Sequence, residues 1–179
     1  HEESTPFWQG TPLLENLSLA LSLRSSGGIK VKNRYADFDE LMVYSDLVAT
    51  TISSMSLAIF GYRDEVAVER GRDLATAFQL TNILRDVGED THKDRIYLHQ
   101  DELERFGVKE SDLKEKKMTP AFTEMMRFQV QRVRELYHRA EPLIDLIEPD
   151  ARRCTCLMGS VYYRILNKIE ELDYRIFDK

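Results

Sequence analysis

The stretch that decides the fold reads Ala77-Phe-Gln-Leu-Thr-Asn-Ile-Leu-Arg-Asp-Val-Gly-Glu-Asp90. Neither glycine nor proline occurs from Asp73 to Val87, and Ala, Leu, Gln, Arg and Glu are frequent, which predicts a helix. At about 100° per residue, two amides and two carboxylates fall on one stripe about 80° wide, formed by Gln79, Asn82, Asp86 and Asp90. Apolar residues cover the other faces, so we expect this helix to be buried nearly all round.

A buried stripe of this kind needs partners, because an unpaired buried charge is very costly. Acidic pairs four residues apart are also common on solvated helix faces, and that is the plain alternative. Like charges at this spacing destabilise a helix by about 0.2–0.5 kcal/mol unless something compensates. Three cations flank the pair and could grip phosphate, at Arg85, Lys93 and Arg95. Oxygen ligands suit Mg²⁺ bridged to a diphosphate, and a metal-held leaving group implies ionisation chemistry.

The bulk composition is that of a helical protein with a sizeable core. The chain has 179 residues, 42% of them hydrophobic, with only 8 Gly and 5 Pro. A formal charge of −6 disfavours nucleic-acid binding through phosphate neutralisation. Cys154 and Cys156 would point to different faces of a helix, so we expect neither a mutual disulfide nor a zinc site, and a reducing compartment. No apolar run of about 18 residues occurs, so no membrane span is expected.

The whole chain is predicted to be all-α, because no strand alternation is visible. The expected elements are Leu13–Leu23, Asp37–Phe60, Asp64 to about Glu89, Gln100–Arg105, a turn capped by Ser111, Thr119 to about Ile147 with a break at Pro142, and Pro149 to about Phe177. A linker, or a gap in the sequence, is expected at residues 25–28. Each of the four histidines, His1, His92, His99 and His138, is expected at the surface rather than as a catalytic base. No phosphate-binding Gly-rich loop or nucleophile elbow is present.

The Asp-rich block resembles the second aspartate-rich region of the squalene/phytoene synthase family, most of all its phytoene synthases. The residues that carry the likeness are Gln79 to Asp90, followed by Arg95-Ile-Tyr-Leu98 and Gln100-Asp-Glu-Leu103. Two further blocks agree, one from Arg34 to Ala49 and one from Tyr162 to Tyr174. The likeness covers roughly residues 34–174.

The resemblance implies an isoprenoid-synthase-type helical bundle around a central cavity. Two geranylgeranyl diphosphates would be joined there head to head into phytoene, through a cyclopropylcarbinyl diphosphate and without nicotinamide. The apolar faces of the Asp37–Phe60 helix and of the terminal helix would enclose the prenyl tails.

The resemblance also assigns site residues by position. Mg²⁺, or Mn²⁺ in its place, would be bound by Asn82, Asp86 and Asp90. The remaining residues would contact diphosphate or line the reaction pocket, namely Gln79, Arg85, Tyr97 and Tyr162, with Arg95 a weaker candidate. Core packing is the alternative for each tyrosine. The catalytic set is therefore expected to comprise Asp86, Asp90, Tyr97 and Tyr162.

The chain departs from the family pattern in several places. The family carries a first Asp-x-x-x-Asp motif on an earlier helix, whereas the acids before Asp37 are only Glu2, Glu3 and Glu15. Thr50 and Ser53 stand where small glycines are expected, which would narrow the pocket, and His99 stands where proline is usual. We therefore expect residues 1–179 to form one helical domain that is the later portion of a synthase, incomplete at the N-terminus.

Other functions stay open at this point. Squalene or dehydrosqualene synthesis from farnesyl diphosphate is the nearest alternative, and a non-catalytic relative that acts as an assembly or scaffold protein is a second. The expected partner is a prenyl diphosphate, with peripheral membrane contact because the product is very apolar, and no nucleic acid. The expected location is the cytoplasm or the membrane periphery, or the plastid in a photosynthetic eukaryote.

Overall fold

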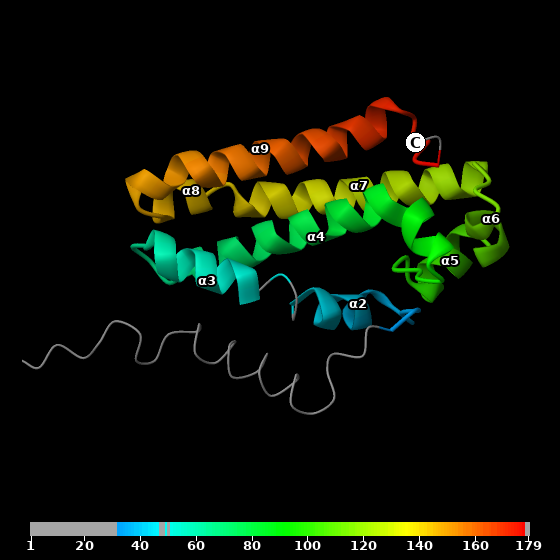
Figure 1. Cartoon of the computed structure of the whole chain (residues 1–179), viewed down its shortest axis with the longest axis horizontal. Helices are drawn as coiled ribbons and strands as arrows, with labels where there is room; N and C mark the ends of the chain where they lie inside the picture. The colour runs from blue at the N-terminus through cyan, green and yellow to red at the C-terminus, as the bar shows by residue number, and fades with distance from the viewer. Residues whose placement is uncertain (1–31, 47–48, 50, 178–179) are drawn as a thin grey trace, which may run out of the picture.

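The computed structural model describes residues 32–46, 49 and 51–177, and this part of the chain is helical without a β-strand (Figure 1). Its helices are α2 (Phe38–Ser45), α3 (Thr51–Phe60), α4 (Val66–His92), α5 (Gln100–Phe106), α6 (Glu110–Lys114), α7 (Pro120–Ala140), α8 (Leu143–Leu146) and α9 (Pro149–Glu171). Two isolated bridges tie loops together, Arg34 with Ile96 and Tyr62 with Ile147. The all-α prediction is confirmed. Within the described ranges, no helix is long and apolar enough to cross a membrane.

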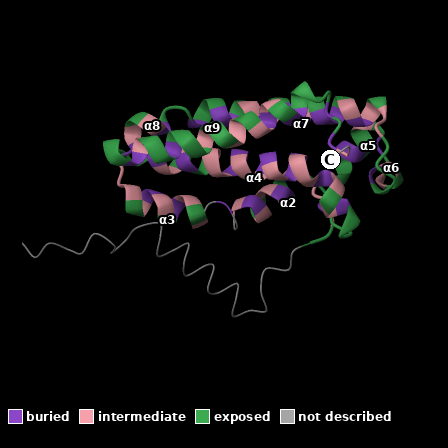
Figure 2. Cartoon of the chain, turned by 45° about the horizontal axis from the view of Figure 1, so that its top comes forward, coloured by how far each residue is buried: buried purple, intermediate pink, exposed green. Residues whose placement is uncertain are grey.

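Helix α4 is the centre of the bundle. It packs against α3, α6, α7, α8 and α9, and α7 and α9 run alongside it over much of its length (Figure 1). Its buried positions are Ala67, Gly71, Thr76, Ala77, Leu80, Thr81, Ile83, Leu84, Val87 and Thr91. Figure 2 shows buried and half-buried residues along most of α4, as the sequence predicts.

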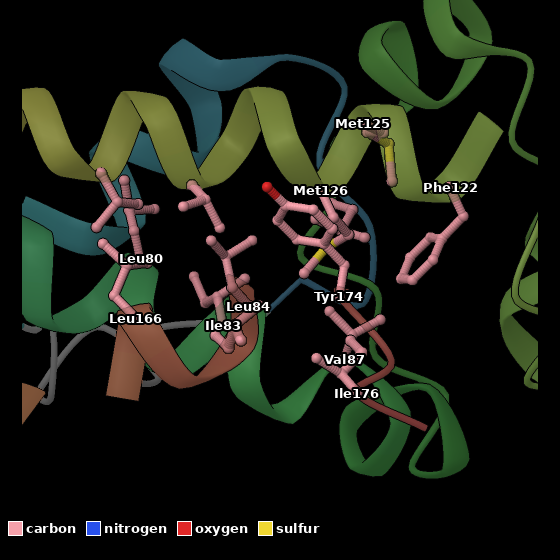
Figure 3. Close-up of a cluster of buried hydrophobic side chains, with 14 of the residues drawn as sticks. Leu80, Ile83, Leu84, Val87, Phe122, Met125, Met126, Leu166, Tyr174 and Ile176 are labelled. Carbon is pink, nitrogen blue, oxygen red and sulfur yellow. The ribbon is translucent and has the colours of Figure 1, made fainter. Parts of the chain in front are cut away.

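The main core lies between α4 and α7. Leu80, Ile83, Leu84 and Val87 project from α4 toward a group on other elements, which comprises Phe122, Met125, Met126, Leu166, Tyr174 and Ile176 (Figure 3). Burying each large aliphatic side chain contributes about 1.5–3 kcal/mol. A smaller end cluster closes the bundle near α8 and is formed by Leu57, Ala67, Leu143, Ile147 and Ala151.

The helix ends are set by the residues that the sequence indicates. Asp37 accepts a hydrogen bond from the Glu40 backbone N–H at 2.8 Å and so caps α2. Gly61 adopts a φ of +73° at the end of α3, a conformation that glycine adopts without steric cost. Thr119 caps α7, and the predicted break at Pro142 separates α7 from α8.

Other boundaries differ from the prediction. Where one helix is expected over residues 37–60, the described residues form α2 and α3, and both Asp46 and Ala49 between them are π-helical. Helix α9 ends at Glu171 rather than near residue 177. The reason is that Asp173 and Tyr174 adopt positive φ values of 49° and 61°, which turns the Tyr174 side chain into the core.

Two further predictions concern the start of α6 and the residues before α2. Helix α6 begins at Glu110 after Lys109, so Ser111 lies inside the helix and does not cap it. The expected helix over residues 13–23 and the expected linker at residues 25–28 lie outside the described residues.

Candidate active site

The polar stripe of α4 borders two different cavities. Gln79 and Asn82 line a cavity of about 310 Å³ together with Tyr162 of α9. Asp90 lines a much smaller cavity of about 10 Å³ together with Arg95 and Tyr97. The structure therefore brings the two predicted tyrosines to different parts of the stripe: among the described residues, Tyr162 lines the larger cavity and Tyr97 the smaller one.

The larger cavity is mostly apolar. It lies between α3, α4, α8 and α9, and its apolar lining residues are Ala49, Ile52, Leu57, Phe60, Gly71, Leu74, Ala75, Phe78, Leu143, Ile147 and Met158. Phe78 and Tyr162 stack with ring centroids 4.3 Å apart at an angle of 21°. The faces of α3 and α9 thus border an apolar space, and the Gln79 and Asn82 amides and the Tyr162 phenol line it at the end toward the carboxylates of α4.

Asn82 carries an unsatisfied polar atom at that end of the cavity. Its side-chain Oδ1 is buried and finds no hydrogen-bond partner within the described part of the chain. A buried carbonyl oxygen without a partner costs about 1–3 kcal/mol. Native proteins satisfy most such groups, so this oxygen is suited to a ligand.

The two carboxylates of the stripe differ in how they are compensated. Asp86 is bound by its neighbour Arg85, with Nε to Oδ1 at 2.7 Å and Nη2 to Oδ2 at 2.5 Å. The pKa of Asp90 is raised, chiefly by its partial burial and next by the charge of Asp86, although Lys93 and Arg95 act in the opposite direction. A raised pKa is expected for a carboxyl group that is partly buried near a second carboxylate, where the nearby cations do not compensate fully.

The residues fit a divalent cation only if an amide joins the carboxylates. Among the described residues, no group of three or more His, Cys, Asp or Glu side chains could hold a metal ion. Asn82, Asp86 and Asp90 offer one amide oxygen and two carboxylates, and the Asn82 oxygen is the orphaned one. This donor set suits Mg²⁺, which is usually bound by one or two carboxylates together with substrate phosphates and retained waters.

Tyr97 belongs to a tyrosine cluster next to the small cavity. Its ring lies 5.7 Å from both Tyr35 and Tyr44, centroid to centroid, in stacked geometry. The Tyr35 hydroxyl is buried and has no partner among the described residues. Burial, and next a hydrogen bond with Tyr97, raise the pKa of Tyr44. Reasoning from the sequence missed Tyr35 and Tyr44 as neighbours of Tyr97, although both lie in the block that begins at Arg34.

The prediction that every histidine lies at the surface is wrong for His99. Its side chain is 1% exposed, and its ring nitrogens face two carboxylates, Asp101 and Glu102, the latter at 3.1 Å. Arg132 of α7 pairs with Glu102 and lies over the Phe38 ring, 4.1 Å from its centroid. The available signal was the His99-x-x-Glu102 spacing at the start of a helix. His92 and His138 are exposed, and His1 lies outside the described residues.

The remaining predicted residue, Arg95, is exposed beside Asp90, and its backbone N–H donates to the Asp90 carbonyl at 2.8 Å. The charges of Arg95 and of the exposed Lys93 both act on Asp90, at the carboxylate end of the stripe.

Comparison with known proteins agrees with this architecture. The squalene/phytoene synthase family model matches residues 28–179. The phytoene synthase of Arthrospira platensis is 41% identical over 161 residues, which cover 83% of this chain and 52% of that protein. The chloroplastic phytoene synthase of Narcissus pseudonarcissus is 38% identical over 154 residues, which cover 83% of this chain and 36% of that protein.

Solved structures show the same fold. A dehydrosqualene synthase in complex with ligand superposes with a TM-score of 0.79 at 28% identity, over 93% of this chain and 57% of that chain. A squalene synthase from Alicyclobacillus acidocaldarius gives a TM-score of 0.79 at 24% identity, over 90% of this chain and 60% of that chain. The bundle is thus an isoprenoid-synthase-type helical fold. The chain belongs to the squalene/phytoene synthase family, whose members are prenyltransferase-type enzymes. It spans about half or less of the length of the two phytoene synthases named above.

Proposed function

We propose that this chain supplies the Mg²⁺- and diphosphate-binding wall of an enzyme that joins two geranylgeranyl diphosphates head to head into phytoene. The observation that carries the proposal is the orphaned Asn82 oxygen at the polar end of an apolar cavity. Asp86 and Asp90 follow it by about one and two turns of the same helix. A diphosphate with a long hydrocarbon tail matches this arrangement, because its charged head would lie at the polar residues of α4 and its tail in the apolar cavity.

The oxygen-bearing and the cationic side chains of the site would have different roles. Asn82, Asp86 and Asp90 would hold Mg²⁺, or Mn²⁺ in its place, and Arg85 and Arg95 would bind phosphate oxygens. The bound metal would stabilise the charge of the departing diphosphate. The reaction would pass through a cyclopropylcarbinyl diphosphate and would need no nicotinamide to end at phytoene.

The apolar cavity would hold the tail and keep water from the carbocation that remains. Gln79 and the Phe78–Tyr162 stack line its polar end, where aromatic faces favour positive charge. Tyr97 would act on the other side of Asp90, beside Arg95. Core packing remains the alternative for both tyrosines.

Two other functions have support of their own. Ser53 in the cavity wall favours a narrower site, as for the farnesyl diphosphate of a squalene or dehydrosqualene synthase. No second acidic group that could hold a metal ion with this stripe occurs among the described residues, which favours a non-catalytic scaffold relative. A very apolar product also implies peripheral contact with a membrane. The plastid is the expected location if the source is a photosynthetic eukaryote, since the Narcissus relative is chloroplastic.

The test is Mg²⁺-dependent release of diphosphate from geranylgeranyl diphosphate. We expect Asp86→Asn to abolish release, whereas Asp39→Asn, a change on the exposed side of α2, leaves it intact. Release that is unchanged in Asp86→Asn refutes the metal assignment. If both substrates are offered and only farnesyl diphosphate is consumed, the phytoene proposal fails. A chain that binds the substrate with Mg²⁺ but never releases diphosphate supports the non-catalytic alternative.

A further inference from the structure

A second cavity lies behind the first. It has a volume of about 280 Å³ and is formed by α4, α7, α8 and α9, with a lining that includes Tyr137, Ile144 and Tyr163. Three residues line both cavities, namely Leu74, Leu143 and Thr155. These three residues contribute to both linings, and we call them the shared wall.

The shared wall is apolar and mostly buried. Leu143 is 3% exposed and Thr155 is 4% exposed. The Thr155 hydroxyl donates to the Ala151 carbonyl at 3.1 Å, so its polar atom is satisfied within the helix. Leu74 is half-buried and packs against both the main core and the end cluster. No charged group belongs to the wall, and a hydrocarbon chain could therefore contact it on either side.

The shared wall also stands at a defined distance from the polar end of the first cavity. Leu74 precedes Asn82 by eight residues on α4, which corresponds to about 12 Å along the helix axis. A prenyl chain whose diphosphate lies at Asn82 and Asp86 would run along α4 toward Leu74. Near Leu74 the chain meets the shared wall. The second cavity on the other side, at about 280 Å³, is almost as large as the first, at about 310 Å³.

We propose that the shared wall determines which length of prenyl chain is preferred, and we call it the length gauge. The second cavity binds the distal isoprene units of any chain that passes Leu74. This inference rests on the proposed function, because it needs a prenyl diphosphate in the first cavity. Leu74 is the decisive residue, since it lies on the same helix as the diphosphate-binding residues. One methylene group in an apolar pocket changes discrimination between substrates by about 10-fold or more, so a whole leucine side chain is enough to shift the preferred length.

The test compares Leu74→Ala, which opens the wall, with Leu74→Phe, which thickens it. Binding of non-hydrolysable farnesyl, geranylgeranyl and geranylfarnesyl thiolodiphosphates is measured by calorimetry with Mg²⁺. We expect Leu74→Ala to raise the affinity for each longer chain, relative to the next shorter one, at least about tenfold. Leu74→Phe should change the same ratio in the opposite direction.

Leu146→Ala is the matched control, because Leu146 also packs against the end cluster but lines neither cavity. Its affinity ratios should equal those of the wild type, and circular dichroism tests whether each variant folds. Ratios within twofold of the wild type in both folded Leu74 variants would overturn the gauge while leaving the proposed function intact. A wild-type chain that binds no prenyl diphosphate with Mg²⁺ would overturn both. If Leu74→Ala does not fold, Leu74→Phe alone decides the outcome by the same ratio.

Discussion

Two groups of buried or half-buried polar side chains differ in how completely their hydrogen-bonding atoms find partners. Around His99, the partners are complete: Glu102 accepts from Arg132, Gln129 and the His99 ring, and Asp101 faces the other ring nitrogen. Along α4, Asn82 keeps a buried oxygen without a partner in the described part of the chain. Complete networks stabilise a fold, whereas an incomplete one in a cavity is suited to a ligand.

The pKa values of the carboxyl groups differ in the same way. Burial alone would raise the pKa of Glu102, but hydrogen bonds from His99 and Arg132 outweigh it and the pKa is lowered. Burial also raises the pKa of Asp90, and the charge of Asp86 adds to the increase. Lys93 and Arg95 do not outweigh these two effects, so the pKa of Asp90 remains raised. Glu102 is thus stabilised as an anion by the fold itself, while Asp90 gains most from a bound cation.

The largest expected effect is the loss of Glu102. In Glu102→Ala, Arg132 and His99 keep their buried positions without their shared carboxylate, so we expect a loss of about 3–5 kcal/mol in the free energy of unfolding. Urea denaturation measures it. The control is Glu104→Ala, an exposed position of the same helix, which should change stability by no more than about 0.5 kcal/mol. Equal effects of the two changes would mean that the His99 cluster does not stabilise the fold.

A smaller effect is expected from pH. Burial lowers the pKa of His99, but hydrogen bonds to Glu102 and Asp101 outweigh it and the pKa is raised. The stabilisation is therefore complete below the unfolded value of about 6.5 and is lost as pH rises through the higher folded value. We expect a loss of about 1.5–3 kcal/mol in the free energy of unfolding, the usual contribution of a hydrogen bond to a charged group. Thermal unfolding above pH 6 measures it, and His99→Gln should remove the slope; a slope that persists in this variant would contradict the assignment.

The smallest effect should have the opposite sign. Asp90→Asn removes a half-buried anion that lies four residues from Asp86, so we expect a gain of about 0.2–0.5 kcal/mol in stability. The same change should weaken Mg²⁺-dependent binding of prenyl diphosphate. Stability and ligand binding would then move in opposite directions at one residue, as in active sites that sacrifice stability for function. A clear loss of stability in Asp90→Asn would show that the fold already compensates this carboxylate.

The sequence predicts those features that depend only on residues close to one another in the chain. The helical period places Asn82, Asp86 and Asp90 on one stripe, and Pro142 marks the break between α7 and α8. It does not predict that the stripe borders two cavities, because that depends on where α9 and the Tyr97 loop pack against α4. Nor does it predict the burial of His99, which requires Arg132 from a helix distant in sequence. The end of α9 was misplaced because Tyr174 turns back to fill the core.

The central claim is that the α4 stripe is incomplete until a cation and a diphosphate bind. The most direct measurement is a calorimetric titration of the chain with geranylgeranyl thiolodiphosphate, with and without Mg²⁺, in the wild type and in Asp86→Asn. We expect saturable binding that requires Mg²⁺ and is weakened at least about tenfold in the variant, the lower end of what a perturbed metal site loses. Binding that is the same without Mg²⁺, or that is unchanged in Asp86→Asn, would contradict it.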